Sequence, residues 1–501
     1  MPQILRRSQM TKFLEILEIF DITKPGRSKG RQRTIDMTEG GIFRRIFRFS
    51  MPLLFGYLLQ QFYTVVDAWV VGKFAAAADL PAIGIVAPVT SILIGLFMGI
   101  STGAGVVISQ YYGARRRYQA KIAVHTAITI ALVMGLFFML LGIFGTHFLL
   151  RFMNVDESIF DAARTYLTVY SCGLVFLALH NMGTAVIGSV GDNRRPLFFM
   201  ISAGLNILLD LLFVIVFKMG VLGVALATVI AQGITATLVV IALLRDTDCI
   251  KIIPSKLGIN LTMLGKIFRV GIPAAFQLII VAVSEVLVQR YFNSIPSTDA
   301  MSSIEVMSGY TIYTRVEEFL LLPIQAFSVS ITNFVGQNIG KEQYKRARRG
   351  TLAALGSSIL FTTVIVVLLN LFTTEIVSLF TSDENAIRCG VLLLRFISPF
   401  YLLCCFIQVF MGSLSGIGRT FVPMIILVTS FIGARQFYLY AVTGYVSNSV
   451  VSVGLAYPVG WICAGIAIIV YYIICEYDTI LLEAELAAEA ELLAKAEFEE
   501  A

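Results

Sequence analysis

The heptapeptide IFRFSMP, residues 46–52, returns later in the chain as IFRVGIP, residues 267–273. Two further pairs follow at nearly the same offset, ISQYYG (108–113) with ITNFVG (331–336) and GSVGDNRRP (188–196) with GSLSGIGRTFVP (412–423). An offset that stays between about 221 and 227 residues in a chain of 501 indicates a duplicated structural unit. The repeat therefore predicts two similar halves that follow each other along the chain.

The composition predicts that both halves lie in a membrane. Hydrophobic residues make up 57% of the chain and charged residues only 14%, against roughly 25% charged residues in soluble proteins, and the mean hydropathy is +0.83. The apolar stretches are mostly about 20 residues or longer, which matches helices that cross a hydrocarbon layer roughly 30 Å thick. We expect an all-α integral membrane protein with twelve transmembrane helices, near 50–72, 82–109, 121–150, 160–189, 197–217, 222–244, 267–293, 303–335, 350–373, 386–414, 421–443 and 450–474.

Spans and repeat together predict the domain organisation. Residues 44–244 form an N-lobe with helices 1–6, residues 266–474 form a pseudo-symmetric C-lobe with helices 7–12, and residues 245–265 link the two lobes. Because six is an even number, both lobes insert in the same orientation, and such parallel repeats leave a cavity between them that can face either side of the membrane. Outside the lobes, residues 1–43 form a basic arm and residues 475–501 an acidic, Ala/Glu-rich helical tail with the composition of an appended segment.

Lysine and arginine are distributed unevenly between the two sides of the predicted membrane. One side carries the basic segments 115–121, 194–195, 245–269 and 341–349, together with Arg419. The opposite loops carry little beyond Lys73, Arg151 and Lys218. Under the positive-inside rule the basic side, the inter-lobe linker and both termini are cytoplasmic, in a multi-pass protein of a bacterial-type inner membrane. The net charge of +6 then reflects topology and contact with anionic lipid headgroups, not nucleic-acid binding.

One aspartate lies inside an otherwise uncharged span. The stretch LNILLDLLF, residues 205–213, places Asp210 at membrane depth. Inserting an aspartate there costs about 2.5–3.5 kcal/mol, and intramembrane acids usually serve a function. Asp210 is therefore the first candidate for a functional residue.

Three other polar side chains are predicted to lie near Asp210. Asn206 precedes it by one helical turn on the same face, Thr228 lies in the next span, and Asp67 lies deep in the first span. Two carboxylates, an amide and a hydroxyl are hard ligands that suit Na⁺. They equally suit a proton, because burial and a like-charged neighbour both favour the neutral carboxyl. The alternative is structural: hydrogen bonds offset the cost of the acids, and Asn206 and Thr228 join helices.

The second half contains two pairs of opposite charge within its spans. Glu285 and Arg290 share the seventh span, and Arg315 and Glu318 in the eighth are spaced for an intrahelical pair. They form a candidate C-lobe polar or substrate site, with structural or gating ion pairs as the alternative. In the second span, Gly95, Gly99 and Gly103 recur every four residues and predict close packing between helices.

The motifs together resemble those of one known family. SMPLLFGYLLQQFYTVVDAWVVGKF is similar to the first helix of the multidrug and toxic compound extrusion (MATE) transporters of prokaryotic type, SQYYGA and FVGQNIG to their paired helix junctions, and GDNRRP to their fourth-to-fifth helix junction, across roughly residues 44–474. The resemblance implies a V-shaped antiporter that exports cationic or amphipathic drugs and toxic organic compounds in exchange for inward H⁺ or Na⁺.

The resemblance also implies roles for particular residues. Asp67, Asn206, Asp210 and Thr228 look like the cation-coupling site of the N-lobe, where Na⁺ or a proton binds, and Pro52 matches the proline at which helix 1 bends. Some family members carry an acidic site in the C-lobe, and Glu285 does not align with its position. No cofactor is expected apart from the coupling ion. The expected partners are small organic compounds and membrane lipids, and the protein is expected to be a monomer.

Other classes of function remain as alternatives. A flippase for lipid-linked or polysaccharide precursors needs a cationic cavity for pyrophosphate, which the bases Arg290, Arg315, Arg395 and Arg435 at membrane depth keep open. A receptor without turnover is disfavoured by the duplication and the intramembrane acids. An enzyme is not expected, because the three histidines are scattered and no catalytic motif occurs.

Overall fold

The computed structural model describes residues 35–475, apart from 75–78, 154, 193–194 and 298–300. Every element in these ranges is a helix, which confirms the predicted all-α class. The predictions for the arm up to residue 34 and for the tail from residue 476 lie outside the described residues.

The elements follow the predicted order of spans. The first half contains α2 (Ile42–Phe74), α3 (Asp79–Gly113), α4 (Arg117–Phe152), α5 (Glu157–Cys172), α6 (Leu174–Ser189), α7 (Arg195–Asp210), the π-helix η1 (Leu211–Val216) and α8 (Gly220–Leu244). The second half contains η2 (Pro254–Lys256), α9 (Leu261–Asn293), α10 (Ser303–Gly340), α11 (Tyr344–Leu371), α12 (Thr373–Ser378), α13 (Glu384–Ile397), η3 (Ser398–Phe400), α14 (Tyr401–Ile417), α15 (Phe421–Leu427), the π-helix η4 (Val428–Ala434), α16 (Arg435–Tyr445) and a final apolar helix, Val450–Cys475, whose first turn is α17 (Val450–Gly454).

Within the described ranges, nine helices are long and apolar enough to cross a membrane. The pair α5–α6 makes a tenth span, bent by 47°, where the sequence predicts one continuous span over 160–189. The bend falls at Gly173, where a Cβ would lie 2.8 Å from Cγ2 of Val229 on α8, so the absence of a side chain allows α8 to approach. The α2 helix and the shorter apolar helix Met200–Val216 lie at the two remaining predicted spans.

The helix ends follow local sequence signals. The Ser302 side chain accepts from the backbone N–H of Glu305, and the Glu305 carboxylate accepts from the N–H of Ser302, which is a complete capping box for α10. Asn260 caps α9 by accepting from the N–H of Met263. At its C-terminal end, α14 stops at Gly418, whose φ of +94° is the left-handed conformation that glycine tolerates.

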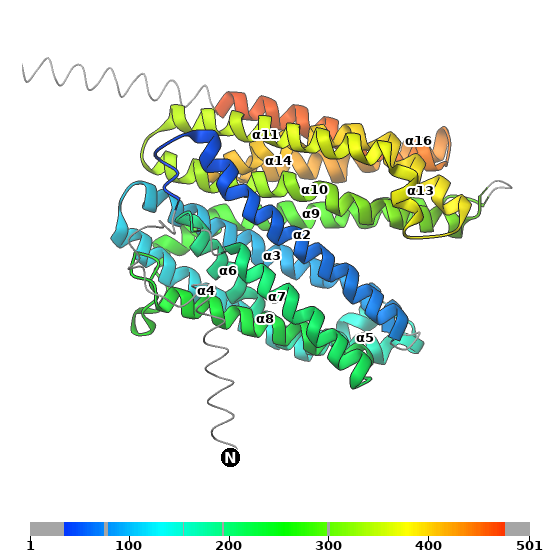
Figure 1. Ribbon diagram of the computed structural model, residues 1–501, viewed down its shortest axis with the longest axis horizontal. Helices are drawn as coiled ribbons and strands as arrows, with labels where there is room; N and C mark the ends of the chain where they lie inside the picture. Colours follow the sequence, from blue (N-terminus) through cyan, green and yellow to red (C-terminus); the bar gives the residue numbers. More distant parts are fainter. Residues whose placement is uncertain (1–34, 75–78, 154, 193–194, 298–300, 476–501) are drawn as a thin grey trace, which may run out of the picture.

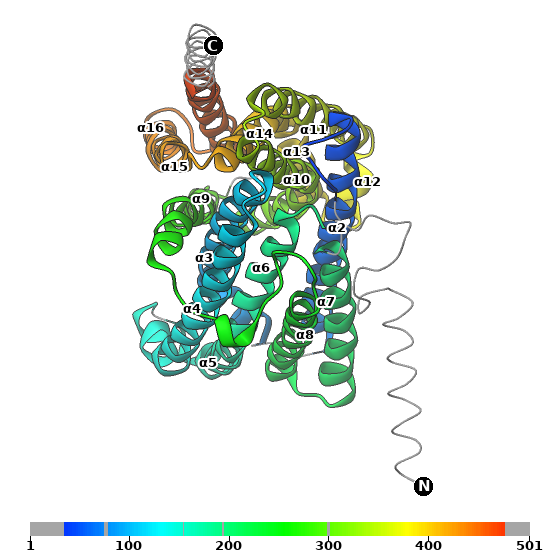
Figure 2. The same cartoon turned by 90° about the vertical axis from the view of Figure 1, so that its left-hand side faces the viewer.

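The helices form two bundles arranged as a V (Figure 1). The bundles lie together at the face that carries the starts of α2, α4 and α11, and they diverge towards the opposite face, where α5 and α13 lie (Figure 1). We call the closed face the basic face, because the clusters at 115–121 and 341–349 lie on it. Viewed from this end, α3, α9 and α10 occupy the junction between the bundles (Figure 2).

The bundles exchange helix starts at the basic face. Ile46, Phe49 and Leu53 of α2 belong to the hydrophobic core built mainly from the second half of the chain. Conversely, Met263 and Ile267 of α9 belong to the core built mainly from the first half. Each of these helices contains one copy of the repeated heptapeptide near its start, so the exchange is reciprocal. A movement of α2 therefore changes the packing of both bundles.

Glycines permit the crossing of α3 and α9. A Cβ at Gly99 would lie 2.2 Å from the Cα of Ala275, and one at Gly103 would lie 2.5 Å from the backbone N of Gly271. The predicted close packing at these glycines is therefore confirmed, and it leaves no room for a methyl group.

We expect Gly103→Ala to destabilise the closed basic face, because its methyl group must push the α9 backbone aside. Overpacking of this kind costs roughly 1–3 kcal/mol. The measurement is thermal unfolding of the purified protein, with Gly84→Ala on the same helix as the matched control, since a Cβ at Gly84 meets nothing within 4 Å. Equal unfolding temperatures for the two variants would contradict the tight crossing.

Candidate functional site

Asp210 ends α7 in a fully buried position. Its exposed fraction is 0%, and the backbone changes there from an α-helix to the π-helix η1. Such π-helical turns are rare and are often found at functional sites. One turn further on, Val214 of η1 packs with Val70 of α2 and Val224 of α8 in one apolar cluster. The carboxylate thus lies about one helical turn from the place where η1, α2 and α8 meet.

Two of the other predicted ligands are in contact with each other. Asn206, one turn before Asp210, donates from Nδ2 to Oγ1 of Thr228 on α8 over 3.4 Å. Asp67 lies on α2 between Val66 and Val70, which both pack in the apolar cluster beside η1. The α2 backbone at Asp67 therefore runs beside the other elements of the predicted site. The Asp67 side chain lies outside the described part of the chain, so its role in an ion site stays a prediction.

Pro52 lies inside α2, which is helical on both sides of it. Proline has no N–H and so leaves the carbonyl four residues earlier without its helical donor. Just before it, the buried Ser50 hydroxyl lies 2.7 Å from the Ser330 hydroxyl of α10. The part of α2 that lacks this backbone hydrogen bond is therefore held against the second bundle. The bend at Pro52 stays a prediction.

The second bundle contains a buried cation, Arg435, at the start of α16. Its side chain is 1% exposed, and Nη1 lies 3.1 Å from Oγ of Ser284 and 3.4 Å from Oε1 of Glu285. The guanidinium carbon lies 4.3 Å from the centre of the Phe431 ring, within the range of cation–π attraction. A Cβ at Gly460 would lie 2.6 Å from Nε, so glycine at this position in the last helix makes room for the charge.

A second carboxylate and several tyrosines complete this cluster. The Tyr457 hydroxyl donates to Oε2 of Glu285 over 2.7 Å. Glu317 of α10 is 8% exposed, and on the same helix the Tyr313 hydroxyl accepts from the Tyr401 hydroxyl over 3.2 Å. A cavity of about 80 Å³ borders both carboxylates and Arg435. Two carboxylates and one guanidinium carry one excess negative charge when both acids are ionised, so the cluster can hold one proton or one small cation.

The predicted C-lobe residues do not lie together. Glu285 pairs with Arg435 from another helix, and Arg290 is exposed. Arg315 and Glu318 form the predicted intrahelical pair at 3.5 Å, and both side chains are more than 40% exposed. Glu318 also accepts from Nε2 of Gln61 on α2. The structure therefore does not unite the four predicted residues in one C-lobe site.

The repeat relates the buried charges of the two bundles. Asp210 and Arg435 lie 225 residues apart, within the offset of the repeated motifs. Each borders a π-helix, since η1 follows Asp210 and η4 precedes Arg435. Related positions of the repeat thus hold a buried acid in one bundle and a buried base in the other. Arg435 was expected at membrane depth, and applying the repeat offset to Asp210 was the sequence signal that could have related the two residues.

A small cavity with a mixed polar and apolar lining lies between the bundles. It has a volume of about 70 Å³ and takes lining residues from α3, α6 and α10. Its polar lining consists of Ser101, Thr102, Asn181, Thr332 and Asn333. The inner end of the V therefore offers both hydrogen-bonding groups and apolar surface, which suits an amphipathic compound.

Duplicated helical bundles, buried charges at related positions of the repeat and a cavity between the bundles are features of a multi-pass membrane transporter. The chain belongs to the MatE family, whose model matches residues 52–212 and again residues 273–440. The two matches begin at Pro52 and Pro273, the last residues of the repeated heptapeptide, so each half contains one copy of the family unit.

Similar proteins cover nearly the same length. The probable multidrug resistance protein YoeA of Bacillus subtilis (strain 168) is 24% identical over 443 residues, covering 87% of this chain and 94% of its own length. The multidrug export protein MepA of Staphylococcus aureus (strain MSSA476) is 24% identical over 449 residues, covering 88% and 95%. A solved outward-facing structure of a multidrug resistance MATE family transporter of the MOP superfamily has a TM-score of 0.83 at 21% identity, covering 90% of this chain and 99% of that chain.

Proposed function

We propose that this protein is a secondary antiporter that exports cationic or amphipathic organic compounds in exchange for inward H⁺ or Na⁺. The observation that carries the proposal is the fully buried carboxylate of Asp210 at the α7–η1 junction, beside the Asn206–Thr228 pair. An acid at this depth has a reason to exist if a cation neutralises it during each transport cycle. Relatives named as multidrug resistance and multidrug export proteins support the substrate class.

The packing of α2 offers a route from ion binding to a change of access. An external cation that reaches Asp210 and Asp67 removes a buried charge beside η1 and α8, and this changes the packing that α2 prefers. Because the start of α2 packs in the core of the second bundle, its movement shifts one bundle against the other. The compound then leaves to the outside, and the bundles rock to the inward-facing state.

Charge balance limits how the membrane voltage contributes. Moving one charge across the membrane is worth about 2.3 kcal/mol per 100 mV. Exchange of one monovalent ion for one monovalent drug cation moves no net charge, so it depends on the ion gradient alone. Exchange of two ions per drug would add a contribution from the voltage.

The flippase alternative is weaker on the described side chains. Two of the four bases that favoured it are paired with acids, Arg435 with Glu285 and Arg315 with Glu318. A pyrophosphate group needs cations that are available in the cavity, and these pairings offset that charge.

The test is export of a fluorescent organic cation from proteoliposomes under separately imposed Na⁺ and pH gradients. We expect one of the two gradients to drive accumulation of the dye against its own gradient, and collapse of that gradient to stop it. Empty liposomes control for leakage. A dye export rate that does not change with either gradient would count against the antiporter. So would a protein that exports no dye but transports a lipid-linked pyrophosphate.

A further inference from the structure

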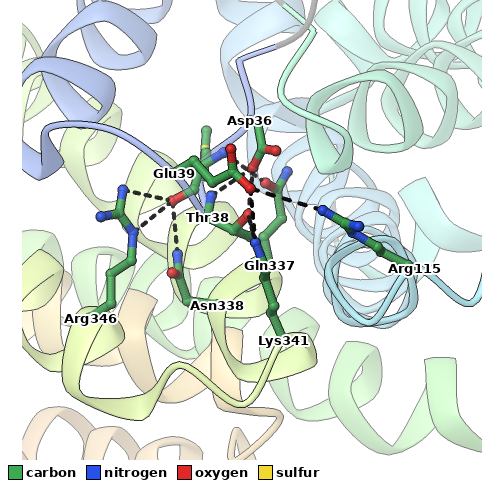
Figure 3. A network of polar contacts seen from close by, with 9 residues as sticks. Asp36, Thr38, Glu39, Arg115, Gln337, Asn338, Lys341 and Arg346 are labelled. Carbon is green, nitrogen blue, oxygen red and sulfur yellow. Dashed lines mark hydrogen bonds and ion pairs between the residues drawn. The ribbon is translucent and has the colours of Figure 1, made fainter.

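A short segment before α2 lies across the basic face where the two bundles meet (Figure 3). We refer to residues 35–39 as the 35–39 segment. The backbone N–H of Ile35 donates to the carbonyl of Gly191, between α6 and α7, over 2.8 Å. Gly191 has a φ of +77°, and a Cβ there would lie 2.2 Å from the carbonyl oxygen of Ile35. Glycine is therefore required for the segment to dock on the first bundle.

The same segment is held by the second bundle through the backbone of Met37. Its N–H donates to Oε1 of Gln337 over 3.1 Å, and its carbonyl accepts from Nδ2 of Asn338 over 3.1 Å. Arg346 of α11 donates to the same carbonyl from Nε and Nη2, each over 3.3 Å. The Met37 side chain is 0% exposed, so the segment is a packed part of the fold.

Gln337 joins the segment and both bundles. While its Oε1 accepts from Met37, its Nε2 donates to the carbonyl of Ser189 at the end of α6 over 2.8 Å. The side chain is 0% exposed. Both ends of this buried amide are hydrogen-bonded only while the two bundles and the segment are together, and separating them leaves polar groups unmatched.

Charges surround the segment on its outer side. Lys341 donates to the Thr38 hydroxyl and pairs with Glu39, each at 3.1 Å, and Arg115 in the turn between α3 and α4 lies 3.9 Å from Glu39. Burial acts to raise the pKa of Asp36, but hydrogen bonds from the Thr38 hydroxyl and amide and the charge of Lys341 hold that pKa below its ordinary value. Asp36 therefore stays ionised and fixes the turn of the segment.

We propose that the 35–39 segment is a latch that keeps the basic face closed while the V is open on the other side. The inference rests on the proposed alternating-access function. When the bundles part at the basic face, the contacts to the first bundle break: Ile35 with Gly191, Gln337 with Ser189 and Glu39 with Arg115. The segment is then uncovered, and the side chains of Ile35 and Met37, which are buried while the face is closed, become accessible to water.

The first test measures how often the latch opens. A Met37→Cys thiol, in a chain with Cys172 and Cys463 replaced by serine, is exposed to a water-soluble thiol reagent on the basic face of purified protein. We expect slow labelling compared with Tyr118→Cys, because Met37 is buried and Tyr118 is 74% exposed. Glu39→Gln removes both outer ion pairs and should speed Met37→Cys labelling roughly two- to fivefold, since exposed pairs contribute little each.

The matched control is Glu342→Gln, which neutralises an exposed acid next to Lys341 and should leave the labelling rate unchanged. Ile35→Cys, 1% exposed in the native chain, repeats the measurement if Met37→Cys does not fold. Labelling of Met37→Cys as fast as that of Tyr118→Cys would overturn the latch. A Met37→Cys labelling rate that Glu39→Gln leaves unchanged would also overturn it.

The second test locks the latch to the first bundle. Glu39→Cys and Arg115→Cys are joined by a short bifunctional thiol reagent that a reductant cleaves. We expect linked protein to stop exporting the fluorescent cation and cleaved protein to resume. Export by fully linked protein contradicts the latch. Export that is absent in the native chain contradicts the proposed function instead, and the labelling test, which needs no transport, still decides the latch.

Discussion

Replacing Asp210 by asparagine is expected to abolish ion-coupled export while leaving folding and membrane insertion intact. The amide has nearly the shape of the carboxyl group but carries no charge, so no cation is bound or released at the α7–η1 junction. Removing the aspartate also removes an insertion cost of about 2.5–3.5 kcal/mol, so the protein should not become less stable. The measurement is gradient-driven dye export at equal membrane abundance, and we expect the rate to fall to that of empty liposomes.

The matched control for this variant is Asp161→Asn, which makes the same chemical change at an exposed position of α5. It should export at the native rate. Undiminished export by Asp210→Asn would remove the carboxylate from the coupling mechanism and leave it a structural residue.

Replacing Arg435 by methionine is expected to destabilise the second bundle strongly. Breaking a buried ion pair by removing one partner costs about 3–5 kcal/mol, because the remaining charge is left uncompensated. The Glu285 side chain is 37% exposed, so we expect the lower end of that range. The unfolding temperature of the purified protein is the measurement.

A double variant separates loss of the ion pair from loss of packing. Arg435→Met with Glu285→Gln removes both charges and should recover a large part of the lost stability. Arg290→Met is the control, since Arg290 is an exposed arginine on the same helix as Glu285, and it should be nearly neutral. Strictly additive losses in the double variant would show that the pair is not coupled.

The arrangement of spans could be predicted from the sequence because it follows from patterns with simple physical causes. Hydrocarbon thickness sets the length of each apolar run, and the repeat of IFRFSMP as IFRVGIP sets the division into halves. The break between α5 and α6 was missed because Gly173 is one glycine among 40 in the chain. Its role depends on how closely Val229 of α8 approaches, which no local pattern reports.

The charged residues show a similar limit. A charge at membrane depth is visible in the sequence, so Asp210, Glu285 and Arg435 could each be recognised as unusual. The partner of each charge depends on which helix faces it. Arg290 is near Glu285 in sequence, yet the ion pair forms with Arg435, 150 residues away, because α9 and α16 bring them together.

The contacts of the 35–39 segment were beyond sequence reasoning for the same reason. Met37 and Gln337 are 300 residues apart, and their hydrogen bond joins a backbone N–H to the side-chain amide of a glutamine. The sequence around Met37 and Gln337 has no composition or periodicity that predicts the contact. Only the folded chain shows that the start of α2 lies where the ends of α6 and α10 meet.

The most direct measurement of the central claim is ion movement driven by the exported compound. In proteoliposomes without an imposed ion gradient, an outwardly directed gradient of an organic cation should drive H⁺ or Na⁺ inward through the native protein, and Asp210→Asn should show no such movement. Movement of the organic cation without any counter-movement of ions, or ion movement that persists in Asp210→Asn, would contradict the account.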